Sequence, residues 1–243
     1  MSRVIVIGDI HGAFKALQHV VELVVPSPDD HFIFLGDYVD GWPESAQVVE
    51  YLLSFNQLYH CDFILGNHDV WCRNWLVNGK TNPTWLAHGG KEAIASYDGF
   101  SDASIEAHRQ FFSSLKHHVV DSDNRLFIHA GYATDKGPAA EINGESYNWD
   151  RSLWTEALKA FANGADSRRP LPHRVQLYTE IYIGHTPTIR YGSYKPMQAL
   201  NVYNIDTGAG FDGKLTAMDI RTGEIWQSHR VPVYYPGIKG RAG

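Results

Sequence analysis

The sequence predicts an α/β protein whose sheet is at least partly parallel. Short apolar strands alternate with amphipathic helices from Val4 to Leu65, and this order is typical of parallel strands joined by crossover helices. Hydrophobic residues make up 44% of the chain and charged residues 20%, the usual balance of a globular protein. At roughly 150 residues per domain, the 243 residues fit one domain, expected to span 1–243.

The elements of the N-terminal part follow from hydrophobic spacing. Runs of β-branched and apolar residues predict buried strands, and apolar residues repeated at helical spacing predict amphipathic helices. Pro26 and Pro28 stop the first helix, because proline cannot continue a helical hydrogen-bond ladder. The elements expected here are strands over 4–7, 32–35 and 62–65 and helices over 13–25 and 44–55.

The remainder of the chain is predicted by the same reasoning. Residues 70–116 are expected to be mostly helical, and the polar stretch Asn163 to Pro172 is the best candidate for a mobile surface loop. The three segments 201–205, 215–220 and 224–227 predict an antiparallel meander, because turn residues separate them. Further elements are expected as strands over 125–129 and 181–183 and a short helix over 154–162.

Charge and cysteine content exclude several classes of protein. Lys plus Arg number 21 and Asp plus Glu 27, so the net charge is 21 − 27 = −6, which argues against extended binding to nucleic acid. Cys61 and Cys72 form no CxxC pair, which favours a reducing, cytoplasmic location. No apolar run approaches the ~18 residues of a membrane span. The sequence leaves the oligomeric state open.

Polar, glycine-flanked motifs follow five of the predicted strands. Ligands of α/β sheets bind beyond the carboxyl ends of the strands, so Asp, His and Asn side chains at these positions are candidates for metal ligands. Each motif alone is weak evidence, but all five in this order point to a metal site. The motifs are GDIHG at 8–12, GDYVDG at 36–41, GNHD at 66–69, IHAG at 128–131 and GHTP at 184–187.

This series of motifs resembles that of the calcineurin-like metallophosphoesterases. It is most similar to the bacterial and phage branch of the serine/threonine phosphoprotein phosphatases, whose relatives include symmetrical diadenosine tetraphosphate hydrolases. The resemblance runs from Gly8 to Pro187 and is far more specific for the superfamily than for the substrate. It implies a four-layer α/β/β/α sandwich with two mixed β-sheets and a metal site at one edge.

The resemblance also implies a set of ligands for two divalent metal ions. A carboxylate has two oxygens, so it can bridge two cations that lie ~3.5–4 Å apart. Mixed carboxylate, imidazole and amide ligands suit manganese, expected here, and also iron or zinc. The implied ligands are Asp9 and His11 for the first ion, Asp37 as the bridge, and Asn67, His129 and His185 for the second ion.

Two further residues carry implied catalytic roles. In the family, the histidine at the position of His68 protonates the leaving oxygen, and the aspartate at the position of Asp40 orients that histidine. The attacking group is a hydroxide that bridges the two metal ions. The alternative for Asp40 is a turn residue whose carboxylate accepts hydrogen bonds from backbone amides.

One departure from the family pattern concerns phosphate binding. The second motif of the phosphatases usually continues Asp-Arg-Gly, and its arginine binds the phosphate, but here the chain reads Asp40-Gly41-Trp42. Arg151 is the first candidate to replace this arginine and Arg73 the second, although each could be a solvated surface residue. Trp42 could offer a flat face to a base or an aromatic leaving group, which would favour nucleotides.

The sequence therefore supports three functions of unequal weight. The first is a metal-dependent phosphomonoesterase of the serine/threonine protein phosphatase type, which acts on a phosphorylated protein or a small phosphoester. The alternative is a nucleotide or dinucleoside polyphosphate hydrolase. A catalytically silent metal-binding scaffold is less favoured, because all six implied ligands and His68 are present.

Overall fold

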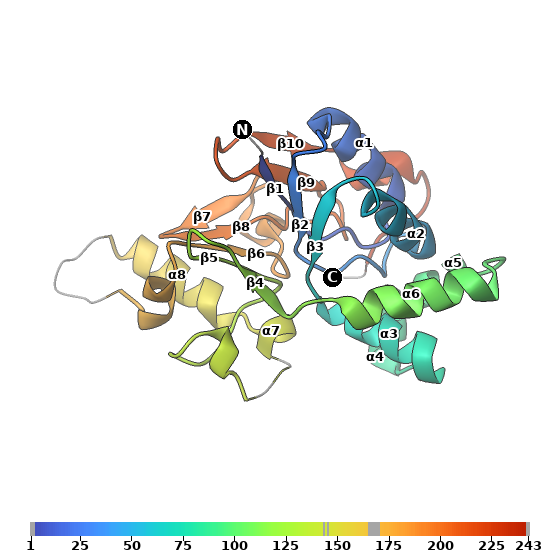
Figure 1. Ribbon diagram of the computed structural model, residues 1–243, viewed down its shortest axis with the longest axis horizontal. Coiled ribbons are helices and arrows are strands. Elements are labelled where there is room, and N and C mark those ends of the chain that lie inside the picture. The colour runs from blue at the N-terminus through green and yellow to red at the C-terminus, as the bar shows by residue number, and fades with distance from the viewer. Residues whose placement is uncertain (1–2, 143, 145, 165–170, 242–243) are drawn as a thin grey trace.

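Two mixed five-stranded sheets form the centre of the structure (Figure 1). The structure is a computed structural model, and it describes residues 3–142, 144, 146–164 and 171–241. The first sheet has the strand order β10-β9-β1-β2-β3 and the second the order β4-β5-β6-β8-β7. In the first, β1, β2 and β3 are parallel, whereas β9 is antiparallel to both β1 and β10. In the second, β5, β6 and β8 are parallel, and both edge strands are antiparallel to their neighbours.

The strands are short, three or four residues each. Those of the first sheet are β1 (Val4–Ile7), β2 (His31–Phe34), β3 (His60–Phe63), β9 (Thr216–Asp219) and β10 (Ile225–Gln227). Those of the second sheet are β4 (His118–Val120), β5 (Arg125–Ile128), β6 (Glu180–Ile183), β7 (Met197–Ala199) and β8 (Val202–Asn204).

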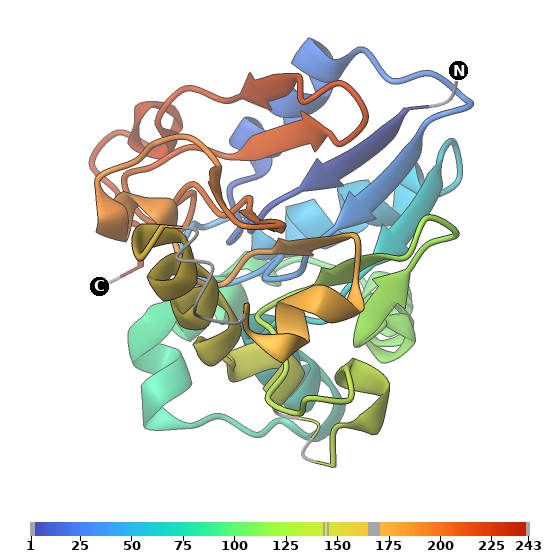
Figure 2. The same cartoon turned by 90° about the vertical axis from the view of Figure 1, so that its left-hand side faces the viewer.

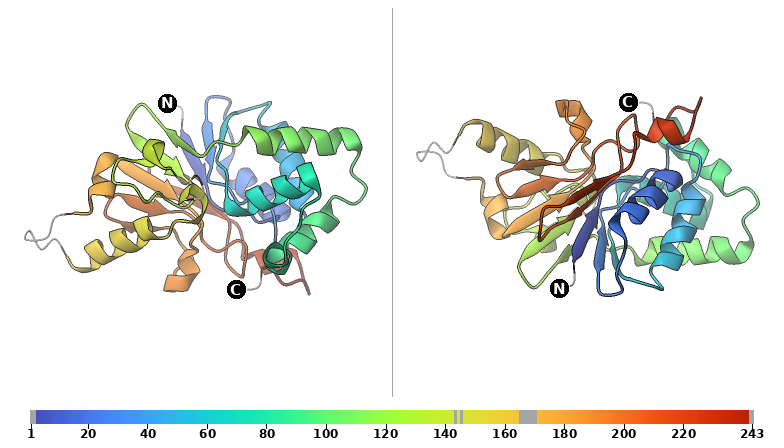
Figure 3. Two further views of the ribbon diagram at one scale, coloured as in Figure 1. Left: turned by 90° about the horizontal axis from the view of Figure 1, so that it is seen from below. Right: turned by 90° about the horizontal axis from the view of Figure 1, so that it is seen from above.

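Helices cover the outer face of each sheet (Figure 3). α1 and α2 lie over the first sheet, where α1 contacts β9 and β10, and α8 packs against β7 of the second. The α-helices are α1 (Phe14–Val24), α2 (Ser45–Phe55), α3 (Asn67–Asn78), α4 (Pro83–Trp85), α5 (Lys91–Ser96), α6 (Asp102–Ser114), α7 (Ser146–Trp149) and α8 (Ser152–Ala162). A 3₁₀ helix over Val231–Tyr234 follows the last strand and contacts α1.

The alternation of side chains along the strands builds one core between the sheets and one outside each of them. Val6 and Ile33 of the first sheet pack with Phe127 and Tyr182 of the second, whereas Ile5 belongs to the core beneath α1 and α2. Successive strand residues point to opposite faces, so each central strand supplies both cores. The predicted four-layer α/β/β/α sandwich is therefore confirmed.

The predicted C-terminal meander is wrong for its first strand, whereas the antiparallel pairing of its last two strands is confirmed. β8 pairs parallel to β6 in the second sheet, while β9 and β10 form an antiparallel pair beside β1 in the first (Figure 2). The connection over 205–215 therefore crosses from one sheet to the other. Local hydrophobic spacing identifies strands but carries no information on which sheet they join.

Smaller differences concern boundaries and two edge strands. β3 begins two residues before the predicted strand and ends at Phe63, because Ile64 pairs with Lys116 in an isolated bridge. β4 and β7 were not predicted. Most of the expected mobile loop, residues 165–170, lies outside the described residues. None of the helices in the described part of the chain is long and apolar enough to cross a membrane.

The core between the sheets is expected to contribute strongly to stability. Phe127 is fully buried and stacks on Tyr182 with ring centroids 5.1 Å apart. Phe127→Ala should lower the free energy of unfolding by about 3–5 kcal/mol through lost burial and a residual cavity, as measured by urea unfolding of the metal-free protein. Phe161→Ala, at a phenylalanine that is 61% exposed on α8, is the matched control. Equal effects of the two substitutions would contradict this assignment of the core.

Candidate metal centre and active site

The polar motifs converge at one edge of the sandwich because the strands before them are parallel. β1, β2 and β3 deliver three of the motifs from one sheet, and β5 and β6 deliver two from the other. All six predicted ligands are at most 7% exposed, so the two sheets enclose them. The structure thus brings together all six: Asp9, His11, Asp37, Asn67, His129 and His185.

Asp37 lies between two groups of candidate ligands. Its Oδ2 is 3.5 Å from Nε2 of His11, and its Oδ1 is 3.5 Å from Nε2 of His129. The two carboxylate oxygens therefore face different histidines, and each distance leaves room for a cation between the donor atoms. This is the arrangement that a bridging carboxylate requires.

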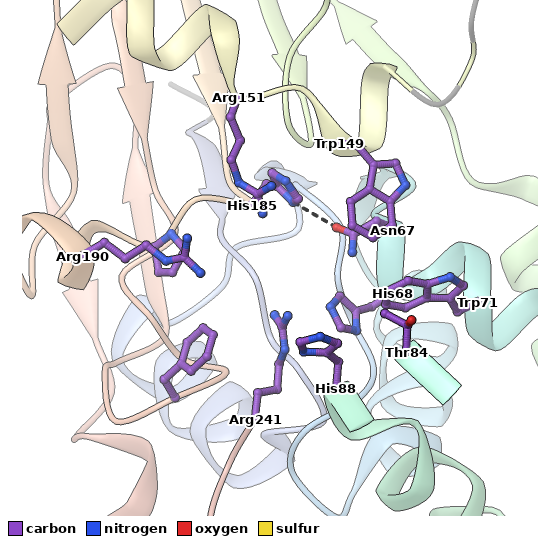
Figure 4. A pocket seen from close by; sticks show the side chains of 12 residues that line it. Asn67, His68, Trp71, Thr84, His88, Trp149, Arg151, His185, Arg190 and Arg241 are labelled. Carbon is purple, nitrogen blue, oxygen red and sulfur yellow. Dashed lines mark hydrogen bonds between the residues drawn. The ribbon is translucent and has the colours of Figure 1, made fainter. Parts of the chain in front are cut away.

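The two groups are completed by neighbouring motifs. On one side, Oδ2 of Asp9 is 3.8 Å from Nε2 of His11. On the other, the Asn67 side-chain oxygen lies 3.2 Å from Nε2 of His129 and 2.9 Å from Nδ1 of His185 (Figure 4). With Asp37, oxygen and nitrogen atoms of all five motifs thus point at two adjacent positions.

The charges of this cluster fit divalent cations. Burial raises the pKa of the Asp9 carboxyl well above its usual value, and the nearby Asp206 carboxylate raises it further. Burial likewise raises the pKa of Asp206 to about 6. Buried carboxylates are costly unless a cation compensates them. In addition, Nε2 of His185 is buried with no hydrogen-bond partner among the described residues. The donor set therefore suits metal ions that take oxygen and nitrogen ligands.

The backbone is strained at four of the site residues. His11, Asp37, Asp40 and His185 have φ values of 54°, 52°, 73° and 65°, in the left-handed region that non-glycine residues rarely adopt. Such strain costs of order 1–3 kcal/mol per residue and persists only when surrounding contacts hold it.

Asp69 supplies several of those contacts. Its carboxylate is fully buried and accepts hydrogen bonds from the backbone amides of Asp37, Tyr38 and Gly66, at 2.8, 2.9 and 2.8 Å. Asp69 thereby joins the motif after β2 to the motif after β3. It is a positioning residue that the sequence analysis did not assign, although it belongs to the GNHD motif.

His68 and Asp40 form a buried pair beside the ligand cluster. Nδ1 of His68 lies 2.6 Å from Oδ2 of Asp40, and the same oxygen accepts a hydrogen bond of 2.8 Å from the indole of Trp85. Because Nδ1 is held by the carboxylate, Nε2 is the ring nitrogen that can act in the cavity that His68 lines. Burial, followed by the charge of Arg241, lowers the pKa of His68 well below its usual value.

A cavity of about 180 Å³ opens next to this pair. Three arginines line it, namely Arg151, Arg190 and Arg241. Burial, and then the positive charges of Arg190 and Arg241, lower the pKa of Arg151. The cavity also has aromatic walls from Trp71, Trp149 and Phe211. A site of this kind can accept an anionic group and an aromatic one side by side.

Of the candidates for the missing arginine, only Arg151 lines the cavity with His68 (Figure 4). Arg73 belongs to α3 and lines a neighbouring cavity together with Asn74 and His117. Sequence reasoning missed Arg190 and Arg241. Arg190 follows the GHTP motif at 184–187 as closely as Arg73 follows the GNHD motif, so its position was a usable signal. Arg241 lies far from all five motifs, so no local signal pointed to it.

The expectation that Trp42 offers a flat face to a substrate is not met. The indole is fully buried, stacks on Tyr235 with ring centroids 5.0 Å apart, and donates a hydrogen bond of 2.7 Å to the carbonyl of Ala209. The segment after β10 covers it, which gives Trp42 a structural role that its local sequence did not indicate.

Comparison with known proteins agrees with the fold and shows the family. The family model for calcineurin-like phosphoesterases matches residues 2–207, and the chain belongs to this family. It is therefore a metal-dependent phosphoric ester hydrolase.

Individual relatives differ in their substrates. The chain is 27% identical to the asymmetrical bis(5′-nucleosyl)-tetraphosphatase PrpE of Bacillus cereus (strain 03BB102), with 88% of each chain covered. Among solved structures, it resembles a putative diadenosine tetraphosphatase with a TM-score of 0.62 and 18% identity, covering 93% of this chain and 92% of that one. It also resembles a serine/threonine phosphatase from Saccharomyces cerevisiae, with a TM-score of 0.61 and 15% identity, covering 98% and 82%. The likeness to the solved structures concerns the fold alone.

Removal of the Asp69 carboxylate should loosen the site. Asp69→Ala leaves three buried amides without their acceptor, at roughly 1–3 kcal/mol each. We therefore expect the free energy of unfolding to fall by about 3 kcal/mol or more. Affinity for manganese should fall as well, because Asp37 loses its support. Urea unfolding and calorimetric titration measure the two effects, with the exposed Asp98→Ala as control. Unchanged metal affinity in Asp69→Ala would contradict the positioning role.

Proposed function

We propose that the chain hydrolyses phosphoric anhydrides or esters of nucleotides at a site that holds two divalent metal ions, with manganese as the first choice. The observation that carries the proposal is the position of the His68–Asp40 pair, between the ligand cluster centred on Asp37 and a cavity lined by three arginines. Asp9, His11 and Asp37 would hold one ion. Asp37 would share the second with Asn67, His129 and His185.

When bound, the metal ions would lower the pKa of a water molecule that attacks phosphorus and would neutralise charge on the phosphate oxygens. The protein contributes the geometry around them. The Asp40 carboxylate accepts a hydrogen bond from Nδ1–H of His68 and so fixes the orientation of the ring. The negative charge of a bound phosphate would raise the pKa of His68 against the lowering by burial and Arg241. The ring could then hold a proton at Nε2 and transfer it to the oxygen of the leaving group.

Two observations favour a nucleotide substrate. Arg151, Arg190 and Arg241 surround the cavity, and guanidinium groups bind phosphates through paired hydrogen bonds. Trp71 and Trp149 stand in edge-to-face contact, with centroids 5.1 Å apart, at the wall of the same cavity. Since Trp149 is 38% exposed, its ring is accessible for stacking on a base. The tetraphosphatase relatives support the same substrate class.

A serine/threonine phosphoprotein phosphatase is the second candidate. It is favoured by the five-motif series and by the similar fold of the yeast phosphatase. For a phosphoprotein, the aromatic wall would have no base to contact, and the three arginines would exceed the charge of one phosphate group.

The role of His68 predicts a dependence on the leaving group. His68→Asn should lower kcat by roughly 10²-fold or more for alkyl phosphates, whose leaving oxygen needs a proton. The loss should be much smaller for p-nitrophenyl phosphate, because p-nitrophenolate leaves without one. Kinetics of both substrates with added manganese measure the difference, and the exposed His173→Asn is the control. Equal losses on the two substrates would contradict the acid role.

The substrate class is tested by comparing kcat/KM for diadenosine tetraphosphate with that for a phosphoserine peptide. The proposal predicts the higher value for the dinucleotide. A higher value for the peptide would favour the second candidate, and hydrolysis of neither substrate by metal-loaded protein would contradict both.

A further inference from the structure

The segment after β10 returns to the active site. Its 3₁₀ helix packs on α1, and the Tyr235 hydroxyl accepts a hydrogen bond from the backbone amide of Lys15 at 3.2 Å. Tyr235 then stacks on Trp42. At the far end, the amide of Arg241 donates to the carbonyl of Gly210 at 2.8 Å. These contacts fix the path of the backbone and place the side chain of Arg241 at the cavity.

Glycines make room for the stem of Arg241. A Cβ atom at Gly41 would lie 2.7 Å from Cγ of Arg241, and a Cβ atom at Gly210 would lie 3.2 Å from its Cδ. Gly41 also has a φ of 98°, which side-chain-bearing residues rarely adopt. The guanidinium of Arg241 lies over the ring of Phe211, and its Cζ atom is 5.1 Å from the ring centroid. The space at position 41, where the phosphatases usually carry arginine, is thus occupied by the stem of Arg241.

The guanidinium of Arg241 points at the reaction centre (Figure 4). One terminal nitrogen lies 3.0 Å from Nε2 of His11, and Nε is buried with no hydrogen-bond partner among the described residues. A metal ion bound to His11 would use the lone pair on that Nε2, so this hydrogen bond would be replaced. The guanidinium would then have its donors free beside the ion, where a phosphate oxygen could accept them.

We propose that Arg241 supplies the phosphate-binding guanidinium in place of an arginine at position 41. This inference rests on the proposed function, since it assigns the group that binds the phosphate attacked at the metal site. Arg241 lies against Phe211, whereas Arg151 lies beside His185, across the cavity from Arg241 in Figure 4. Two guanidinium groups would therefore hold the substrate between them, and one of them comes from a segment far from all five motifs.

The test compares Arg241→Ala and Arg241→Lys with the wild type and with Arg221→Ala, an exposed arginine in the turn between β9 and β10. Orthophosphate binding to manganese-loaded protein is measured by calorimetry, and kcat/KM is measured with diadenosine tetraphosphate and p-nitrophenyl phosphate. Manganese affinity and urea unfolding of each variant show whether the site and the fold are intact. Because phosphate binding needs no turnover, it tests Arg241 even if the proposed substrate class is wrong.

We expect Arg241→Ala to weaken orthophosphate binding and kcat/KM by roughly 10-fold to 100-fold, with unfolding unchanged. Manganese affinity should stay the same or rise, because the ion no longer has to displace the guanidinium from His11. Arg241→Lys should recover part of the loss, because lysine restores the charge but not the paired donors. Arg221→Ala should match the wild type.

Two results would overturn the proposal. Unchanged phosphate binding in Arg241→Ala would show that the guanidinium does not contact the phosphate. Tighter manganese binding together with higher activity in Arg241→Ala would show instead that Arg241 competes with the metal ion for His11.

Discussion

The site depends on one buried carboxylate at the seam between the two sheets. Asp37 follows a strand of the first sheet, yet Oδ1 faces His129 of the second sheet while Oδ2 faces His11 of the first. The Asp69 carboxylate accepts a hydrogen bond from the backbone amide of Asp37. A buried charge in this position needs compensation. Burial works against the charged form of Asp37, but the nearby His129 lowers the pKa of its carboxyl well below the usual value. Bound cations would stabilise the charge further.

The position of Asp37 between the two sheets explains why the candidate active site lies at this edge of the sandwich. Parallel strands end together, so β1, β2 and β3 from one sheet and β5 and β6 from the other present their following residues to the same volume. Left-handed backbone at His11, Asp37, Asp40 and His185 turns the side chains inward. Hydrogen bonds between the motifs, such as those accepted by Asp69, stabilise this strained backbone. The stability of the fold and the geometry of the site therefore depend on the same contacts.

The ligand cluster could be predicted from sequence because each ligand lies within a few residues of a recognisable strand end. Long-range packing could not. Nothing near Trp42 indicates that a later segment buries it, and Arg241 is separated from His11 by 230 positions. The prediction that β8, β9 and β10 form one meander failed for the same reason, because hydrophobic spacing describes a strand but not its partner.

Electron paramagnetic resonance of the manganese-loaded protein shows whether Asp37 bridges two metal ions. With two equivalents of Mn²⁺ bound, a shared carboxylate should place the ions ~3.5–4 Å apart, so we expect the spectrum of an exchange-coupled pair. The spectrum of isolated ions at full occupancy, or saturation of binding at one equivalent, would contradict it.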